Sequence, residues 1–268
     1  MNNMSFRYID IHTHVNLDAF EADGVEVAKH TLSEGVAYIN VGTSLESSAH
    51  AVALTGEGVF ATVGLHPVRA GGGSEVEEGE VFDTARYHAL AHGERVVAIG
   101  ECGFDYYRVD KETKAKQEEA FIAQIELANE LQKPLMLHIR DVAGSTEAYE
   151  DALKVLKQYA KVLGNVHFFA STYDIAKQFW DMGYTTSFTG VITFANQYDE
   201  TVKNAPLEML HAETDAPYAT PKPFRGQRNE PLHVREVYKR IAELRGEDSE
   251  TVRQTLLRNA EKMFAITI

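Results

Sequence analysis

Short apolar runs alternate with longer amphipathic stretches along the chain, and this alternation constrains the fold more than any other feature of the sequence. Eight of the apolar runs are strand candidates: residues 7–12, 36–41, 59–64, 96–101, 135–138, 165–169, 184–188 and 209–214. Strands that alternate with helices form right-handed βαβ units and a parallel sheet. Eight of them in 268 residues predict an α/β protein with a TIM-type (β/α)8 barrel, and a doubly wound sheet is the alternative.

One barrel domain is expected to span residues 1–268, with extra helices at its C-terminal end. The last helix is predicted to begin with Ser249 as its N-cap and to bury one apolar face, made of Val252, Leu256, Ala260 and Phe264. In a barrel of this type the chemistry gathers where the strands end, at the C-terminal face. The ends of the predicted strands are therefore the places to look for functional side chains.

The first predicted strand carries a His-x-His pair. Ile9 and Ile11 alternate with Asp10, His12 and His14, so a strand puts the three polar side chains on one face. Two imidazoles one pleat apart can bind one divalent metal ion, such as zinc. A lone His-x-His also occurs by chance, so the metal interpretation depends on what the later strands supply.

Later strand candidates end in further metal-ligand residue types. Glu101 and His138 close their runs, His167 lies within the sixth run, and Asp215 follows the last. Each could singly be a hydrogen-bonded core residue, but unpaired polar groups at several strand ends would be costly. With His12 and His14, these residues suit two divalent ions that share a bridging carboxylate and a bridging hydroxide.

Two further residues lie near these candidates. His211 shares the face of Asp215 by alternation but lies deeper, so we expect a buried, hydrogen-bonded side chain. Cys102 follows Glu101 and should point to the opposite face, with no part in the chemistry.

Composition limits the partners and the compartment. The formal charge of −14 argues against broad electrostatic binding to nucleic acid, although it leaves room for a local basic site. The single cysteine excludes an internal disulfide and suits a reducing compartment, so a cytoplasmic location is expected. The chain has no run of about 18 apolar residues and no apolar signal core at its start, so no membrane span is expected.

Motifs along nearly the whole chain resemble those of TatD-type metal-dependent hydrolases, within the amidohydrolase-like superfamily. In order, they read IDIHTHVNLD, VGLHP, IGECGFDYYR, PLMLHIR, VHFFAS, TSFTGVITF, ETDAPY and RGQRNEP. The resemblance implies a TIM-type barrel, a two-metal site and hydrolytic activity, often described as deoxyribonuclease. Val68 and the run HFFAS depart from the usual family pattern and leave the choice of substrate open.

Carried over by position, the resemblance implies two overlapping ligand sets. One metal would be held by His12, His14, Glu101 and Asp215, and the other by Glu101, His138 and His167. Mg, Zn and Mn are the candidate ions. The resemblance also places four residues toward the substrate: His66, Arg140, Arg225 and Arg228. The alternatives for these four are a structural His-Pro turn, a supporting salt bridge and a solvated basic loop.

Three functions are compatible with this pattern. The first is a phosphodiesterase that acts on a DNA end, a single strand or a small phosphodiester, in which Asp215 takes a proton from the metal-bridged hydroxide or water. The second uses the same site on an amide, lactone or ester carbonyl. The third is a metal-holding scaffold without catalysis, which fits poorly with six intact ligands.

Overall fold

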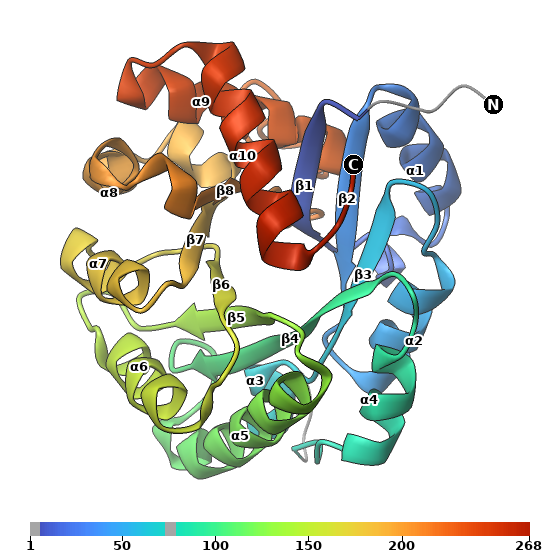
Figure 1. Cartoon of the computed structure of the whole chain (residues 1–268), viewed down its shortest axis with the longest axis vertical. Helices are drawn as coiled ribbons and strands as arrows, with labels where there is room; N and C mark the ends of the chain where they lie inside the picture. Colours follow the sequence, from blue (N-terminus) through green and yellow to red (C-terminus); the bar gives the residue numbers. More distant parts are fainter. Residues whose placement is uncertain (1–5, 73–78) are drawn as a thin grey trace.

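The computed structural model describes residues 6–72 and 79–268, and it contains eight parallel strands in an almost closed ring (Figure 1). Neighbours along the chain are neighbours in the sheet, from β1 to β8. The strands are β1 (Tyr8–Thr13), β2 (Val36–Val41), β3 (Val59–Val63), β4 (Val96–Asp105), β5 (Leu135–Arg140), β6 (Gly164–His167), β7 (Thr185–Phe188) and β8 (Leu210–Ala212). The predicted TIM-type barrel is confirmed, and the doubly wound alternative is wrong.

Helices cover the outside of the ring (Figure 1). They are α1 (Gly24–Ser33), α2 (Leu45–Ala53), α3 (Pro67–Gly71), α4 (Thr84–Ala91), α5 (Lys114–Leu131), α6 (Glu147–Tyr159), α7 (Tyr173–Asp181), α8 (Asp199–Asn204), α9 (Val234–Arg245) and α10 (Ser249–Phe264). Short 3-10 helices lie in the connections: η1 (Asp18–Phe20), η2 (Lys111–Thr113), η3 (Gly190–Thr193), η4 (Asn196–Tyr198), η5 (Leu207–Met209) and η6 (Pro231–His233). Across the described ranges, no helix has the length and apolar character needed to cross a membrane.

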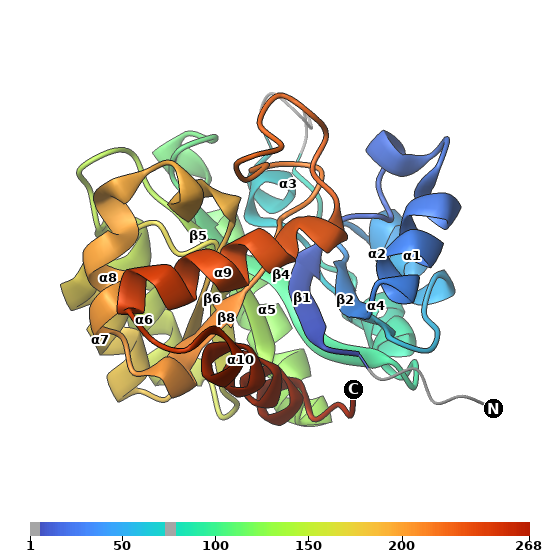
Figure 2. The same ribbon diagram turned by 90° about the horizontal axis from the view of Figure 1, so that it is seen from above.

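Helix α10 packs across the end of the barrel at which the strands begin (Figure 2). Its buried Ala260 and Phe264 belong to one apolar cluster with Ile9, Phe60 and Met136 of the strands. The predicted buried face of this helix is confirmed. The N-cap is Asp248 and not Ser249, because the Asp248 carboxylate accepts the backbone N–H of Thr251. The strand ends at the opposite face carry the candidate site.

The ring closes between β8 and β1 without a regular strand ladder among the described residues. A single bridge joins Thr13 to Ala216. The carboxylate of Asp10 reinforces it by accepting the backbone N–H of Thr214 at 2.9 Å and also the hydroxyl of that residue. Asp10 is fully buried, so these bonds satisfy a group that would otherwise be costly. We call this junction the β8–β1 seam.

Candidate active site

All six predicted metal ligands meet at the C-terminal face of the barrel. His12 lies in β1, Glu101 in β4, His138 in β5 and His167 at the end of β6. His14 directly follows β1, and Asp215 comes three residues after the end of β8. Each residue is at most 9% exposed. The parallel strands carry these side chains to one place because the C-terminal ends of a barrel converge on one face.

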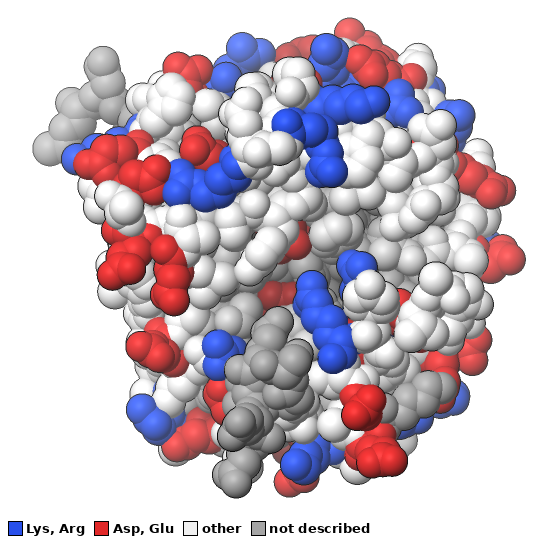
Figure 3. Space-filling model, turned by 180° about the vertical axis from the view of Figure 1, so that it is seen from behind, with Lys and Arg blue, Asp and Glu red and all other residues white. Residues whose placement is uncertain are grey.

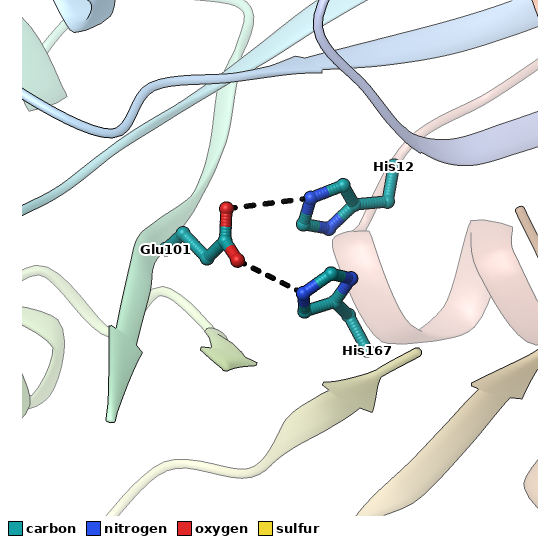
Figure 4. A group of neighbouring side chains, drawn as sticks. All are labelled: His12, Glu101 and His167. Atoms are coloured by element: carbon teal, nitrogen blue, oxygen red, sulfur yellow. Dashed lines mark ion pairs between the residues drawn. The ribbon is translucent and has the colours of Figure 1, made fainter. Parts of the chain in front are cut away.

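The carboxylate of Glu101 faces the imidazoles of His12 and His167, with one oxygen toward each (Figure 4). Its Oε1 lies 2.6 Å from Nδ1 of His138 and 2.9 Å from Nε2 of His167. Its Oε2 lies 3.5 Å from Nε2 of His12 and 3.7 Å from Nε2 of His14. One carboxylate oxygen therefore faces the imidazoles of β5 and β6, and the other faces those of the β1 region.

Asp215 joins the His-x-His pair from the other side of the β8–β1 seam. Its Oδ1 lies 3.3 Å from Nε2 of His14 and 3.8 Å from Nε2 of His12. The Nδ1 atom of His14 lies 3.0 Å from the carbonyl oxygen of Val41. That contact favours a proton on Nδ1 and leaves Nε2 as the ligand atom.

Two carboxylates contact the imidazoles of His138 and His167, and the sequence analysis gave neither of them a role. Asp105 Oδ2 lies 3.0 Å from Nε2 of His138, and Glu213 Oε1 lies 3.3 Å from Nδ1 of His167. Such partners orient a ligand imidazole and increase its basicity. A sequence signal existed for both: alternation from Glu101 puts Asp105 on the same strand face, and alternation from Asp215 does so for Glu213.

The buried carboxylate and imidazole groups of the site shift each other's pKa in opposite directions. Burial by itself raises the pKa of the Glu101 carboxyl, but the facing imidazoles, His167 foremost, hold that pKa well below its usual range. Burial lowers the pKa of His167, but the carboxylates of Glu101 and Glu213 outweigh it and raise the pKa well above its ordinary value. A divalent cation bound here would take the place of the imidazole proton, since metal ligands bind in deprotonated form.

The residues present fit a divalent cation. Three groups each place their ligand atoms within 4.8 Å of one another: His12, Glu101 and His167; His12, His14 and Asp215; and His66, Asp105 and His138. Imidazole and carboxylate are ligands that zinc and related ions take in catalytic sites. The buried Nδ1 atom of His12 also has no hydrogen-bond partner among the described residues.

A pocket of about 690 Å³ opens onto these ligands. His66 and Arg140, which the sequence placed toward the substrate, line it, and so do Arg69 and Arg108, which the sequence analysis did not single out. His66 is also the N-cap of α3: its Nδ1 accepts the N–H of Val68, and its Nε2 lies 3.5 Å from Glu101 Oε1. Figure 3 shows Asp and Glu atoms within the hollow of this face and Lys and Arg side chains along its border.

Arg225 and Arg228 do not line this pocket. Arg228 makes a two-pronged ion pair with Asp23, with N–O distances of 2.8 and 2.7 Å. The guanidinium of Arg225 lies over the ring of Phe194 and donates to the carbonyl oxygen of Thr220. Both side chains are thus held against the protein, which fits neither the expected contact with substrate nor the alternative of a solvated basic loop.

His211 and Cys102 are buried away from the ligands. Burial lowers the pKa of His211 to about 3, so the ring is neutral. The expected burial of His211 is confirmed, but neither ring nitrogen has the expected hydrogen-bond partner in the part of the chain that the structure describes. Cys102 lies in the main apolar core, and its thiol faces the carbonyl oxygen of Met136 at 3.7 Å.

An eight-stranded parallel barrel with histidine and carboxylate side chains positioned at its C-terminal face to bind a metal is the arrangement of a metal-dependent hydrolase of the TIM-barrel class. A family model described as TatD related DNase matches residues 9–265. The chain therefore belongs to the TatD family of metal-dependent hydrolases.

Individual relatives cover almost all of the chain. The uncharacterized metal-dependent hydrolase YabD of Bacillus subtilis is 36% identical over 264 residues, covering 96% of this chain and 98% of that protein. The 3'-5' ssDNA/RNA exonuclease TatD of Cronobacter sakazakii is 34% identical over 267 residues, covering 95% and 97%. The crystal structure of the TatD homologue YJJV from Escherichia coli matches with a TM-score of 0.84 at 28% identity, covering 97% and 99%.

Proposed function

We propose that this protein is a two-metal phosphodiesterase that hydrolyses nucleic acid at an unpaired end. One observation carries the proposal: the Glu101 carboxylate lies between two groups of imidazoles, with one oxygen toward each. The similarity to a relative named as a single-strand exonuclease supports a nucleic-acid substrate. The basic side chains at the pocket support an anionic substrate.

The proposed ligand sets share Glu101. His12, His14 and Asp215 complete one set, and His138 and His167 complete the other. Divalent cations at such sites stabilise the charge that develops on a phosphoryl group and lower the pKa of the attacking water.

The chain's own residues would bind the phosphate and move the proton. Burial raises the pKa of Asp215, but the contacts with His14 and other imidazoles outweigh this effect and hold the pKa below its ordinary value. Asp215 is therefore ionised at neutral pH, and its carboxylate can accept the proton of the attacking water. Arg140, which lines the pocket, can hold phosphate oxygens through its forked N–H donors.

Metal analysis tests the ligand sets. Protein purified without chelator and then saturated with Zn, Mn or Mg is expected to approach two equivalents per chain, measured by elemental analysis after removal of free ion. The reason is that Glu101 presents one carboxylate oxygen to His138 and His167 and the other to His12 and His14. Binding of one equivalent or fewer at saturation would contradict the two-metal site.

Arg140→Ala is expected to lower kcat/KM on a single-stranded oligonucleotide by about ten- to a hundredfold, as for loss of one charge-assisted contact. Arg225→Ala is expected to lose less, because the Arg225 guanidinium does not line the pocket. Arg258→Ala, an exposed change on α10 at the other end of the barrel, controls for the loss of a surface charge.

The same assay separates this proposal from carbonyl hydrolysis. Wild type and variants are tested on the oligonucleotide, a simple phosphodiester and a set of acyl amino acids. A folded, metal-loaded wild type that ignores both phosphodiesters but cleaves an acyl amide would replace the nuclease proposal with the carbonyl one.

A further inference from the structure

Two exposed aromatic side chains lie in or beside the lining of the pocket. In the described ranges, the exposed aromatic residues are Tyr107 and Tyr218, each 58% exposed. Tyr218 lines the pocket. Tyr107 follows the end of β4, and its backbone N–H donates to the carboxylate of Asp105 at 3.0 Å. Tyr107 itself is not among the lining residues, but its ring lies beside the guanidinium of Arg140, which is.

Arg140 connects this aromatic surface to the ligands. Its guanidinium carbon lies 4.9 Å from the ring centre of Tyr107 and 5.9 Å from that of Phe168. Within the described part of the chain, no carboxylate lies within ion-pair distance of this guanidinium, in contrast to Arg228. Among the described residues, Arg140 therefore has two aromatic rings as neighbours and no paired carboxylate.

Phe168 is held at the pocket by an unusual backbone conformation. It directly follows the candidate ligand His167, and it lines the pocket. Its φ is +44°, a region that bulky residues rarely adopt. A hydrogen bond from its N–H to Glu213 Oε1, at 2.7 Å, fixes this conformation. Conformations of this kind cluster at ligand sites, where the surroundings over-determine them.

We propose that Tyr107 and Phe168, together with the Arg140 guanidinium, form a stacking site for an unpaired nucleobase next to the phosphate that is cut. The site rests on the proposed phosphodiesterase function and adds to it the side chains that would hold the unpaired base. Bases stack on aromatic rings and on guanidinium planes with little regard to sequence. A planar guanidinium can stack on one face while its edge binds a phosphate.

The depth of the site explains why an unpaired strand fits. Glu101 is only 3% exposed, so the phosphate has to enter the pocket to reach it. A base that accompanies this phosphate must leave its partner before it can lie against Tyr107 and Phe168. Base-paired ends would therefore have to fray first, which costs energy that an unpaired end does not need to spend.

Binding tests the stacking site without requiring turnover. Metal-loaded wild type is titrated with a fluorescent oligothymidylate whose terminal linkages are phosphorothioates, and with versions that carry an abasic residue at each of the two terminal nucleotides in turn. We expect one abasic position to weaken binding by roughly five- to a hundredfold, the range found for one base–aromatic stack. Equal affinity for all the strands would overturn the stacking site.

Variants test whether the rings of Tyr107 and Phe168 cause the preference for base-bearing strands. Tyr107→Leu and Phe168→Leu are expected to reduce the ratio of the affinity for the base-bearing strand to the affinity for the abasic strand. Tyr107→Phe keeps the ring and should preserve this ratio. Tyr107 is exposed, so its replacement leaves the core intact and the result does not depend on a folding defect. A ratio that is unchanged in both leucine variants would also overturn the proposal.

Failure of the stacking site is distinguishable from failure of the phosphodiesterase proposal. The unmodified oligonucleotides, assayed for cleavage, provide the second readout. Base-dependent binding without any cleavage would contradict the phosphodiesterase function alone. Cleavage of base-bearing and abasic strands with the same kcat/KM would contradict the stacking site alone.

Discussion

Replacing Glu101 by glutamine is expected to lower kcat by more than about a hundredfold, the effect of losing a strong interaction in the transition state. Glutamine has the same size, but only one of its two terminal atoms can accept. The carboxylate of Glu101 presents one oxygen to His138 and His167 and the other to the imidazoles of the β1 region. In the variant, the NH2 group would replace one of these two oxygens. The amide also lacks the negative charge that would offset two cations.

The measurement combines kcat, metal content and thermal unfolding. Glu126→Gln, the same chemical change at an exposed position on α5, is the matched control. We expect the Glu101 variant to keep a cooperative unfolding transition, because the apolar core lies between the sheet and its helices and under α10. Near-normal turnover at full metal content would show that Glu101 does not bridge the two sets.

Asp215→Asn is the second change with a large expected effect, a loss of about a hundred- to ten-thousandfold in kcat, as for removal of a general base. Asn is the appropriate replacement because Asp215 has a φ of +54°, and Asn tolerates this left-handed region. The backbone N–H of Asp215 donates to the carbonyl oxygen of His12 at 2.9 Å, and the variant keeps that bond. The change therefore removes the carboxylate and little else.

Turnover is compared over a range of metal concentrations, so that weakened metal binding is separated from the loss of the base. Asp181→Asn, which removes an exposed carboxylate paired with Lys177 on α7, is the control and should cost little. If Asp215→Asn recovers wild-type kcat once metal is saturating, Asp215 serves as a ligand and another group accepts the proton.

The eight strands could be predicted because strands of a parallel barrel are covered on both faces and read as apolar runs. The predicted end of the fourth strand, at Glu101, was wrong, since β4 continues to Asp105. Glycine and aspartate are rare in strands, so Gly103 and Asp105 argued against the extension. Both residues pair with β5, and this tertiary contact overrides the local preference. Conversely, β8 ends at Ala212, two residues before the prediction.

The meeting of the six candidate ligands could be predicted because strand direction alone brings the ends of parallel strands together. Side chains in the long loop after β8 could not be placed in the same way. The direction of Arg228 is set by Asp23, which is remote in sequence and gives no local signal. The sequence therefore shows that the loop after β8 carries positive charges. Whether such a charge points toward the substrate depends on residues that are close in space but remote in sequence.

The β8–β1 seam gives the proposed metal site a second significance. His12 and His14 stand on one side of the seam and Asp215 stands on the other. Any cation that binds to both sides favours the closed ring over an opened one, by mass action. The ion would then link the first strand region of the barrel to the last. During synthesis, this proposed metal site is incomplete until Asp215 has been added to the chain. Hydrolytic activity would therefore appear only after the ring has closed.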